Sequence, residues 1–309
     1  MGYKLTISNE AYEQLKAIFP EQRLLLNEPM ENHTSFKIGG PADILLLPIN
    51  DIEIQRSLKI CTEFSIPVFV MGNGSNLLVR DKGIRGVVLK IAKNFSHIQV
   101  EGNLIKAQSG IPLSALAKAA VQHSLKGLEF ASGIPGTLGG ATTMNAGAYG
   151  GELKDVIVNV NAMDGTGNSY SYSTEEMQFG YRTSRIQTDK LIVLGVDLVL
   201  ETGNQQESLE LMVELAKQRR EKQPLTYPSA GSTFKRPVGY YAGKLIQDCG
   251  LKGLRVGGAQ ISELHAGFII NLGGATARDV MELIGKVQGI IKDKYGVEMQ
   301  PEVRIIGEE

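Results

Sequence analysis

Residues 132–150 read SGIPGTLGGATTMNAGAYG, and this stretch constrains the fold more than any other part of the chain. It holds six glycines, most of them separated by small residues. So much bare backbone suits either a flexible linker or a backbone surface that presses against a ligand. Ile134, Leu138 and Met144 lie between the glycines, whereas flexible linkers are polar and rich in Gly and Ser. The stretch therefore predicts a binding surface made of backbone.

A second glycine stretch, GNGSN at residues 72–76, follows the apolar run IPVFVM at 66–71. Neither stretch ends in the Gly-Lys-Ser/Thr of a P-loop, and Leu77 stands where a GxGxxG motif needs its third glycine. One such loop is as often a tight turn as a binding site. Two of them beside strands favour a dinucleotide whose pyrophosphate is bound by backbone N–H groups in an extended groove.

The chain has 309 residues, enough for about two domains. Its 32 Lys and Arg nearly cancel 33 Asp and Glu, and only 6% of residues are aromatic, so we expect no nucleic-acid partner. Cys61 and Cys249 form neither a disulfide framework nor a metal-ligand spacing. No signal peptide and no run of ~18 apolar residues is evident, which predicts a cytoplasmic protein without a membrane span.

Strands and helices are mixed along the first ~200 residues. Buried strands are expected at 42–47, 66–71 and 86–91, a hairpin at 97–107, and helices at 8–18 and 112–123. A polar stretch, ETGNQQ at 201–206, marks a boundary before a more helical region. There the apolar spacing of Leu209, Met212, Val213 and Ala216 predicts a helix. A second, short helix is expected at 242–249. A last helix begins at Thr276, with Asp279 completing a capping box and Val280, Leu283, Ile284, Val287, Ile290 and Ile291 forming its apolar stripe.

Three polar motifs are candidates for chemistry. Arg182 in YRTSR could clamp a carboxylate, or be a surface arginine. Ser232 in AGSTFKRP places a hydroxyl near Lys235 and Arg236, or forms an ordinary turn beside a solvated basic pair. Glu302 in PEVRIIG lies in an alternating strand pattern, where an acid usually faces solvent. His33, His97, His123 and His265 form no metal-ligand pair, so no metal site is expected.

Taken in order, these motifs resemble a known enzyme family. NHTSFKIGGPA, GNGSNLLV, EFASGIPGTLGGATTMNAGAYGGE, YRTS, AGSTFKRP, AGKLIQDCGLKG, GGAQIS, HAGFIIN and PEVRIIG make the chain similar to the UDP-N-acetylenolpyruvoylglucosamine reductases from about residue 32 to 307. The resemblance implies an enzyme that uses FAD, with NADPH as hydride donor, to complete UDP-N-acetylmuramate for bacterial cell-wall peptidoglycan.

The resemblance also implies the fold. It predicts an α+β chain with an FAD-binding fold of the vanillyl-alcohol-oxidase type, made of two subdomains, and a C-terminal α+β domain for the UDP-sugar. The FAD-binding region would be 1–202, joined by a returning strand at 298–309, and the substrate domain 203–297. Tyr240 and Tyr241 follow Pro237 almost directly, leaving no room for the tyrosine-bearing loop of one subtype. The chain is therefore similar to the shorter, second subtype. At position 236 it has an arginine where the subtype with the tyrosine loop commonly has an asparagine.

The family's chemistry assigns roles by matched motif. Hydride adds to the terminal alkene carbon, and negative charge then spreads into the substrate carboxylate. Arg182 would stabilise that charge, Glu302 would hydrogen-bond the enolate as a protonated acid, and Ser232 would protonate the carbon. The substrate-side candidates are Lys235, Arg236, Lys244, Gln260 and His265.

FAD is expected to bind without a covalent tether, since no histidine lies in either glycine loop and His33 is only the nearest candidate by motif. The predicted cofactor residues are Gly72, Asn73, Gly74, Ser75, Asn76, Ile134, Pro135, Gly136, Thr137, Gly139, Gly140 and Ala141 at the pyrophosphate, with Asn145 and Gly147 near the isoalloxazine. We expect a monomer. The alternatives are an FAD-dependent oxidase or dehydrogenase of alcohols or sugars, and a nucleotide-binding module without catalytic activity.

Overall fold

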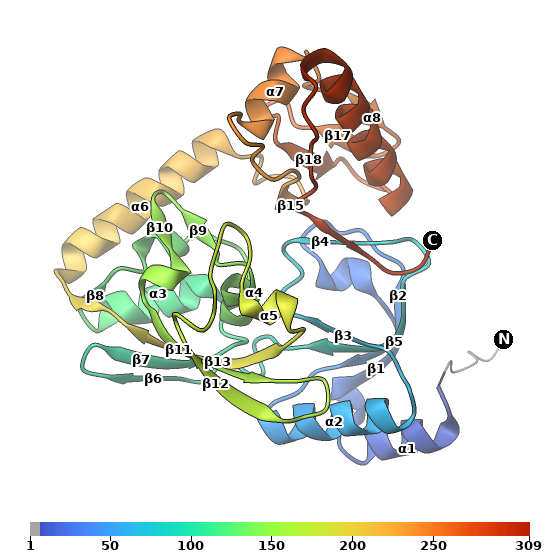
Figure 1. Ribbon diagram of the computed structural model, residues 1–309, viewed down its shortest axis with the longest axis vertical. Coiled ribbons are helices and arrows are strands. Elements are labelled where there is room, and N and C mark those ends of the chain that lie inside the picture. The colour runs from blue at the N-terminus through green and yellow to red at the C-terminus, as the bar shows by residue number, and fades with distance from the viewer. Residues whose placement is uncertain (1–6) are drawn as a thin grey trace. The chain divides into compact units, whose positions relative to one another are not determined.

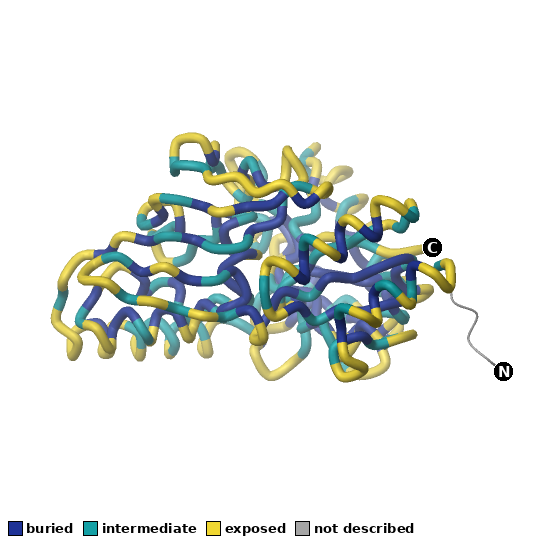
Figure 2. The backbone as a smooth tube through the Cα atoms, turned by 90° about the horizontal axis from the view of Figure 1, so that it is seen from below, coloured by how far each residue is buried: buried dark blue, intermediate teal, exposed yellow. Residues whose placement is uncertain are grey.

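The computed structural model describes residues 7–309, which divide into two compact units. Unit 1 comprises the chain up to Leu26 with Ile44–Asn73 and Gly86–Gln218, and unit 2 comprises Asn27–Asp43, Gly74–Arg85 and Arg219–Glu309. Buried positions follow the strands, while turns and outer helix faces are exposed (Figure 2). Because the chain alternates between the units, motifs distant in sequence meet within each of them.

The first sheet has the strand order β1-β2-β5-β3, with β3 and β5 parallel. Its strands are β1 (Leu24–Pro29), β2 (Pro41–Leu46), β3 (Val68–Met71) and β5 (Ile84–Lys90). Helices α1 (Asn9–Lys16) and α2 (Asp51–Glu63) lie side by side (Figure 1). The side chains of Ser8 and Asn50 cap them by accepting backbone N–H groups, as helix N-termini require. The predicted strands and the first helix are thus confirmed.

A five-stranded antiparallel sheet in unit 1 has the order β12-β11-β13-β7-β6 (Figure 1). Its strands are β6 (Ile98–Glu101), β7 (Leu104–Gln108), β11 (Ile157–Met163), β12 (Ser169–Ser173) and β13 (Ile192–Val199). The predicted hairpin is β6–β7, which turns at Gly102 with φ +61°. Helices α3 (Leu113–Gln122) and α4 (Leu138–Thr143) contribute to the same apolar core, and α4 packs on β13.

Short elements of unit 1 join these larger ones. They are η1 (Glu21–Arg23), β8 (Leu125–Lys126), η3 (Glu129–Ala131), β9 (Gly147–Ala148), β10 (Gly151–Glu152), η4 (Leu153–Asp155), α5 (Arg185–Thr188) and β14 (Glu201–Thr202). The glycine stretch at 132–150 therefore begins directly after η3, forms helix α4 and ends in the turn of the β9–β10 hairpin, so it is not a flexible linker. This ordered course is what a backbone binding surface requires.

Helix α6 (Gln205–Lys222) forms where its apolar spacing predicts, but its burial differs from the prediction. Leu209 and Val213 are 40% and 66% exposed, and only Ser208 is buried. Most residues of α6 are polar, so the apolar stripe identified a helix without identifying a buried face.

Unit 2 holds an antiparallel sheet of order β15-β18-β17-β16. Its strands are β15 (Ser229–Ser232), β16 (Arg255–Val256), β17 (Ala259–Ile261) and β18 (Phe268–Asn271), accompanied by η2 (Met30–His33), α7 (Ala242–Asp248) and α8 (Ala277–Tyr295). The Thr276–Asp279 capping box forms as predicted, and Gly250 ends α7 with φ +70°. The stripe of α8 is buried except at Ile290, which is 39% exposed. The last strand, β19 (Arg304–Ile306), pairs in parallel with β4 (Leu77–Val79).

Candidate active site

The two glycine loops meet within unit 1. Gly72 directly follows β3 and begins the GNGSN loop, and a Cβ built on it would lie 2.2 Å from Thr137 Oγ1, which is far inside contact distance. Thr137 is the N-cap of α4, and its Oγ1 accepts the N–H of Gly140 at 3.4 Å. Glycine at position 72 is therefore what allows the GNGSN loop to touch the GIPGTLGG loop.

The backbone at this junction offers unused donors. Within residues 7–309, the N–H groups of Asn73, Gly136 and Thr137 donate to no protein acceptor. By contrast, the N–H of Leu138 bonds to Ile111 O and that of Gly139 to Ser109 O. Three N–H groups on two touching loops fit the anionic oxygens of a pyrophosphate without any cationic side chain. The residues present therefore fit the diphosphate of FAD.

Asn145 connects the glycine stretch to the segment that carries Arg182. Its buried amide Nδ2 donates to Glu152 Oε2 at 3.0 Å and to Gly180 O at 3.2 Å, and its Oδ1 accepts the N–H of Lys154 at 3.0 Å. The hydrogen bond from Lys154 lowers the pKa of Glu152, and Asn145 and the charge of Arg182 act in the same direction. Neither Glu152 nor Lys154 was predicted as a site residue, although Glu152 is the last residue of the EFASGIPGTLGGATTMNAGAYGGE motif.

Arg182 lies in a tight backbone reversal. Gly180 and Thr183 exchange backbone hydrogen bonds of 3.1 and 3.4 Å across it. Arg182 itself has φ +57°, a backbone conformation that residues other than glycine rarely adopt. Its half-buried guanidinium lies 5.5 Å from the centre of the Tyr181 ring. Such a strained position marks a candidate for function.

Ser232 and Glu302 belong to adjacent segments of unit 2. Thr233 O, next to Ser232, accepts the N–H of Glu302 at 2.8 Å, and Phe234 pairs with Pro301 in an antiparallel bridge. Ser232 is exposed at the end of β15, after Gly231 with φ +77° and an irregularity in the pairing of β15 with β18. Bulges of this kind re-aim side chains, often beside active sites. The structure thus brings two of the three predicted catalytic residues together.

The second half of the GNGSN loop belongs to unit 2. Asn76 Nδ2 donates to Glu302 O at 3.0 Å, and Asn76 O accepts the N–H of Arg304 at 3.0 Å. The β4–β19 pairing continues this contact. The predicted cofactor residue Asn76 is therefore bonded directly to the PEVR segment.

The predicted substrate residues belong to several parts of unit 2: Lys244 lies on α7, Gln260 lies on β17, and Lys235, Arg236 and His265 lie between elements. Lys244 Nζ forms an ion pair with Asp248 at 2.9 Å, and Gln260 Nε2 donates to Gly253 O at 3.1 Å. Arg236 stacks its guanidinium 4.0 Å from the centre of the Tyr241 ring. These contacts neither assign nor remove a role in substrate binding, which stays a prediction.

His265 is held as a neutral imidazole. Its Nδ1 accepts the N–H of Gly267 at 3.1 Å, and its ring meets Phe268 edge-on at 5.0 Å between centres. Burial lowers the pKa of His265, and the nearby charge of Lys252 lowers it further. These contacts orient the imidazole next to β18, and its role toward the substrate stays a prediction.

We expect His265 to make stability depend on pH. The unfolded chain takes up a proton near pH 6.5, whereas the folded chain does so only at a lower pH, so acidification through this interval favours unfolding. Urea unfolding between pH 7 and 5 should show a falling free energy of unfolding in the wild type and a flatter dependence in His265→Gln. Equal slopes in both proteins would contradict this.

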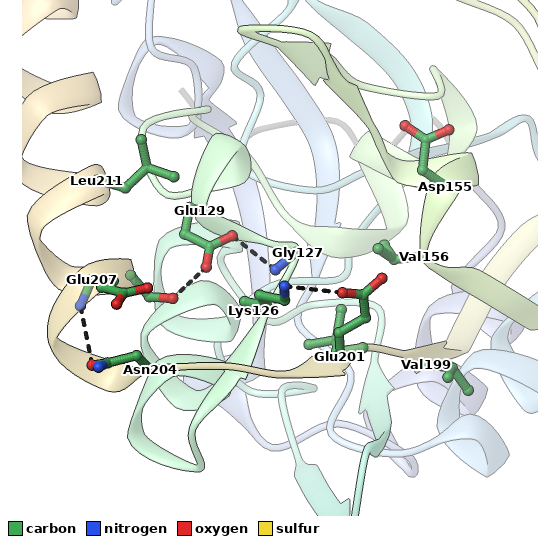
Figure 3. Close-up of a pocket in the computed structure, with 12 residues that line it drawn as sticks. Lys126, Gly127, Glu129, Asp155, Val156, Val199, Glu201, Asn204, Glu207 and Leu211 are labelled. Atoms are coloured by element: carbon green, nitrogen blue, oxygen red, sulfur yellow. Dashed lines mark hydrogen bonds and ion pairs between the residues drawn. The ribbon is translucent and has the colours of Figure 1, made fainter.

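A separate pocket of about 410 Å³ lies in unit 1 (Figure 3). Its buried centre is Glu129, whose carboxylate accepts the Ser208 hydroxyl at 2.6 Å and the Gly127 N–H at 2.8 Å. Lys126 and Glu201 pair at its edge. Every predicted site residue lies outside the lining of this pocket, so it is distinct from the candidate active site.

Comparison with known proteins shows the family of the chain. A model of the FAD binding domain matches residues 42–172, and a model of the C-terminal domain of UDP-N-acetylenolpyruvoylglucosamine reductase matches residues 223–306. The UDP-N-acetylenolpyruvoylglucosamine reductase of Alkaliphilus oremlandii is 54% identical over 300 residues, which cover 97% of this chain and 99% of the relative. The chain belongs to the UDP-N-acetylenolpyruvoylglucosamine reductase family.

The chain is also similar to other members of the UDP-N-acetylenolpyruvoylglucosamine reductase family. The enzyme of Clostridioides difficile is 49% identical, covering 98% of this chain and 99% of the relative. The crystal structure of the Thermus caldophilus enzyme is similar with a TM-score of 0.79 and 37% identity, over 92% of this chain and 98% of that one. Membership of this family confirms the predicted fold class. It also confirms the prediction of an FAD-dependent reductase over the alternative of an alcohol or sugar oxidase.

Two further observations concern what the described part of the chain lacks. Each helix within residues 7–309 is too short or too polar to cross a bilayer. Among the same residues, no three His, Cys, Asp or Glu side chains gather closely enough to hold a metal ion.

Gly72→Ala should weaken FAD binding at least tenfold and destabilise the apoprotein by about 1–3 kcal/mol, because the new methyl group would force the two loops apart. Flavin fluorescence titration and urea unfolding measure the two effects. Gly165→Ala is the matched control, since a Cβ there meets open space within the described chain. Unchanged FAD affinity in Gly72→Ala would show that the contact between the loops does not shape the cofactor site.

Proposed function

We propose that the chain reduces UDP-N-acetylglucosamine enolpyruvate to UDP-N-acetylmuramate with NADPH, as a cytoplasmic step in peptidoglycan precursor synthesis. The observation that carries this is the 54% identity to a UDP-N-acetylenolpyruvoylglucosamine reductase over nearly the whole of both chains. The meeting of the two glycine loops at Gly72 and Thr137 supports it independently, because it supplies the backbone donors that a dinucleotide needs.

We propose that backbone N–H groups bind the diphosphate of FAD. The unused N–H groups of Asn73, Gly136 and Thr137 would bind its diphosphate. When bound, FAD supplies hydride transfer from NADPH to the enolpyruvyl double bond. The protein then has to orient the substrate, stabilise the charge that develops and deliver a proton.

Arg182 is assigned to the developing charge. Negative charge forms at the carbon that bears the ether oxygen and spreads into the neighbouring carboxylate. A guanidinium matches a carboxylate with two parallel hydrogen bonds and accelerates the reaction to the extent that it binds the transition state more tightly than the substrate. The fixed reversal from Gly180 to Thr183 favours this role, because a preorganised donor does not have to reorient during the reaction.

Ser232 is assigned as the proton donor, with Glu302 hydrogen-bonding the enolate. A neutral hydroxyl is a weak acid, so Ser232 needs a neighbour that stabilises its alkoxide or returns the proton. Lys235, three residues further along the same segment, is the candidate for this. The hydrogen bond between Thr233 O and the Glu302 N–H supports a shared role, since it holds the two motifs against each other.

The finer features of the family are also proposals. We assign FAD binding to 1–202 with the returning strand 298–309, and the UDP-sugar to 203–297. The chain fits the shorter subtype, because α7 begins at Ala242, directly after the Tyr240–Tyr241 pair, and no inserted loop separates it from Pro237. We further propose a monomer, with Lys235, Arg236, Lys244, Gln260 and His265 toward the substrate.

A steady-state assay tests the proposal. NADPH consumption by the FAD-loaded protein should require UDP-N-acetylglucosamine enolpyruvate, and mass spectrometry should show a product heavier by two hydrogens. An alcohol or a simple sugar should support no turnover with oxygen. Oxidation of an alcohol without NADPH would support the alternative oxidase instead.

A further inference from the structure

Three side chains form hydrogen bonds that join the backbone reversal at Arg182 to the end of α4. Asn145 Nδ2 donates to Gly180 O at 3.2 Å, Ser184 Oγ donates to Thr143 O at 2.8 Å, and Gln187 Nε2 also donates to Thr143 O at 2.8 Å. We propose that Gln187 is a positioning residue that fixes Arg182 relative to the glycine stretch. This inference rests on the proposed function, because it gives Gln187 its effect through the role of Arg182.

The Gln187 amide uses both of its hydrogens in this contact. Besides Thr143 O, Nε2 donates to Arg182 O at 3.1 Å. An amide NH₂ has two donors, so one group bridges the two carbonyls that must be held together. Gln187 is exposed on α5, and its amide joins the backbone of Thr143 to the backbone of Arg182.

The bridge leads directly to the predicted cofactor loop. Thr143, whose carbonyl receives both Gln187 and Ser184, donates its own Oγ1 to Gly139 O at 2.8 Å. Gly139 belongs to the GIPGTLGG loop, and the Gly139 N–H is bonded to Ser109 O. A continuous set of hydrogen bonds therefore runs from the loop assigned to FAD to the carbonyl of Arg182.

Arg182 needs such support because its backbone is strained. A left-handed conformation is unfavourable for a residue other than glycine, so the surrounding structure must hold it. A displacement of about 1 Å in a catalytic group can cost on the order of 10²-fold in rate. Loosening the Arg182 carbonyl should therefore affect the reaction before it affects the fold.

Gln187→Glu is the sharpest variant, because it keeps the shape and presents carboxylate oxygens to two carbonyl oxygens. We expect anaerobic reoxidation of the reduced flavin by the enolpyruvyl substrate to slow about tenfold, as loss of two hydrogen bonds implies. Gln187→Ala should slow it less. Flavin reduction by NADPH should be unchanged in both. Gln122→Glu, the same change at the exposed end of α3, is the control and should behave as the wild type.

A double-mutant cycle separates positioning from general damage. If Gln187 acts through Arg182, Gln187→Glu should cause no further slowing in an Arg182→Ala background. An equal slowing in both backgrounds, or none in the wild-type background, would overturn the inference while leaving the proposed function intact. If Arg182→Ala alone did not slow reoxidation, the role proposed for Arg182 would fail first, and the inference would fail with it.

Discussion

Ser232→Ala is expected to leave reduction of the bound flavin by NADPH unchanged and to slow its reoxidation by the enolpyruvyl substrate ~10²–10⁴-fold, the usual contribution of a general acid. Hydride transfer from NADPH requires no proton from the protein, whereas completing the product requires one at carbon. Stopped-flow absorbance under anaerobic conditions resolves the two half-reactions.

Ser229→Ala is the matched control for this prediction, because Ser229 begins the same strand β15 that Ser232 ends. It should retain both half-reactions. Loss of flavin reduction in Ser232→Ala would contradict the assignment, since the serine would then be needed for the NADPH step. Wild-type reoxidation in that variant would show that the proton comes from another group.

Arg182→Ala is expected to slow reoxidation by roughly 10²–10³-fold, which is typical for removal of one donor from a preorganised anion site. Arg182→Lys should recover only part of this loss, because an ammonium keeps the charge but cannot form two parallel bonds to a carboxylate. NADPH-driven reduction should again be unaffected. The same stopped-flow experiment, at several substrate concentrations, separates loss of rate from loss of binding.

Arg185→Ala is the control for the arginine prediction. Arg185 is three residues away and pairs with Asp189 at 3.0 Å, outside the proposed chemistry. Its removal should leave reoxidation at the wild-type rate. A similar loss in Arg182→Ala and Arg185→Ala would mean that the segment as a whole, and not the Arg182 guanidinium, is responsible.

The glycine loops show what sequence reasoning could predict. The pattern of glycines with Ile134, Leu138 and Met144 between them predicted an ordered backbone surface, and the structure shows one. The contact between Gly72 and Thr137 was not predictable from either loop alone, because it joins positions 65 residues apart (137 − 72). Long-range contacts of this kind depend on the fold around them.

Other features depended on packing that the pattern does not encode. The stripe of α6 predicted a helix correctly, yet Val213 is exposed, since periodicity cannot tell which helices find a core to cover. Gln187 gave no signal of its own, because an amide in a polar segment is usually solvated, and Asn145 was predicted as a cofactor residue only through the resemblance, not as a link to the Arg182 segment. Their role is visible only when the carbonyls that they bind are known.

In the proposed function, FAD bound to this chain accepts hydride from NADPH and passes it to an enolpyruvyl sugar nucleotide. The most direct test of this function is to mix the yellow FAD-loaded protein anaerobically with one equivalent of NADPH and then with UDP-N-acetylglucosamine enolpyruvate. We expect the flavin absorbance to disappear in the first step and to return fully in the second, with formation of UDP-N-acetylmuramate. Flavin that stays bleached until oxygen is admitted, whatever sugar nucleotide is present, would contradict the proposed function.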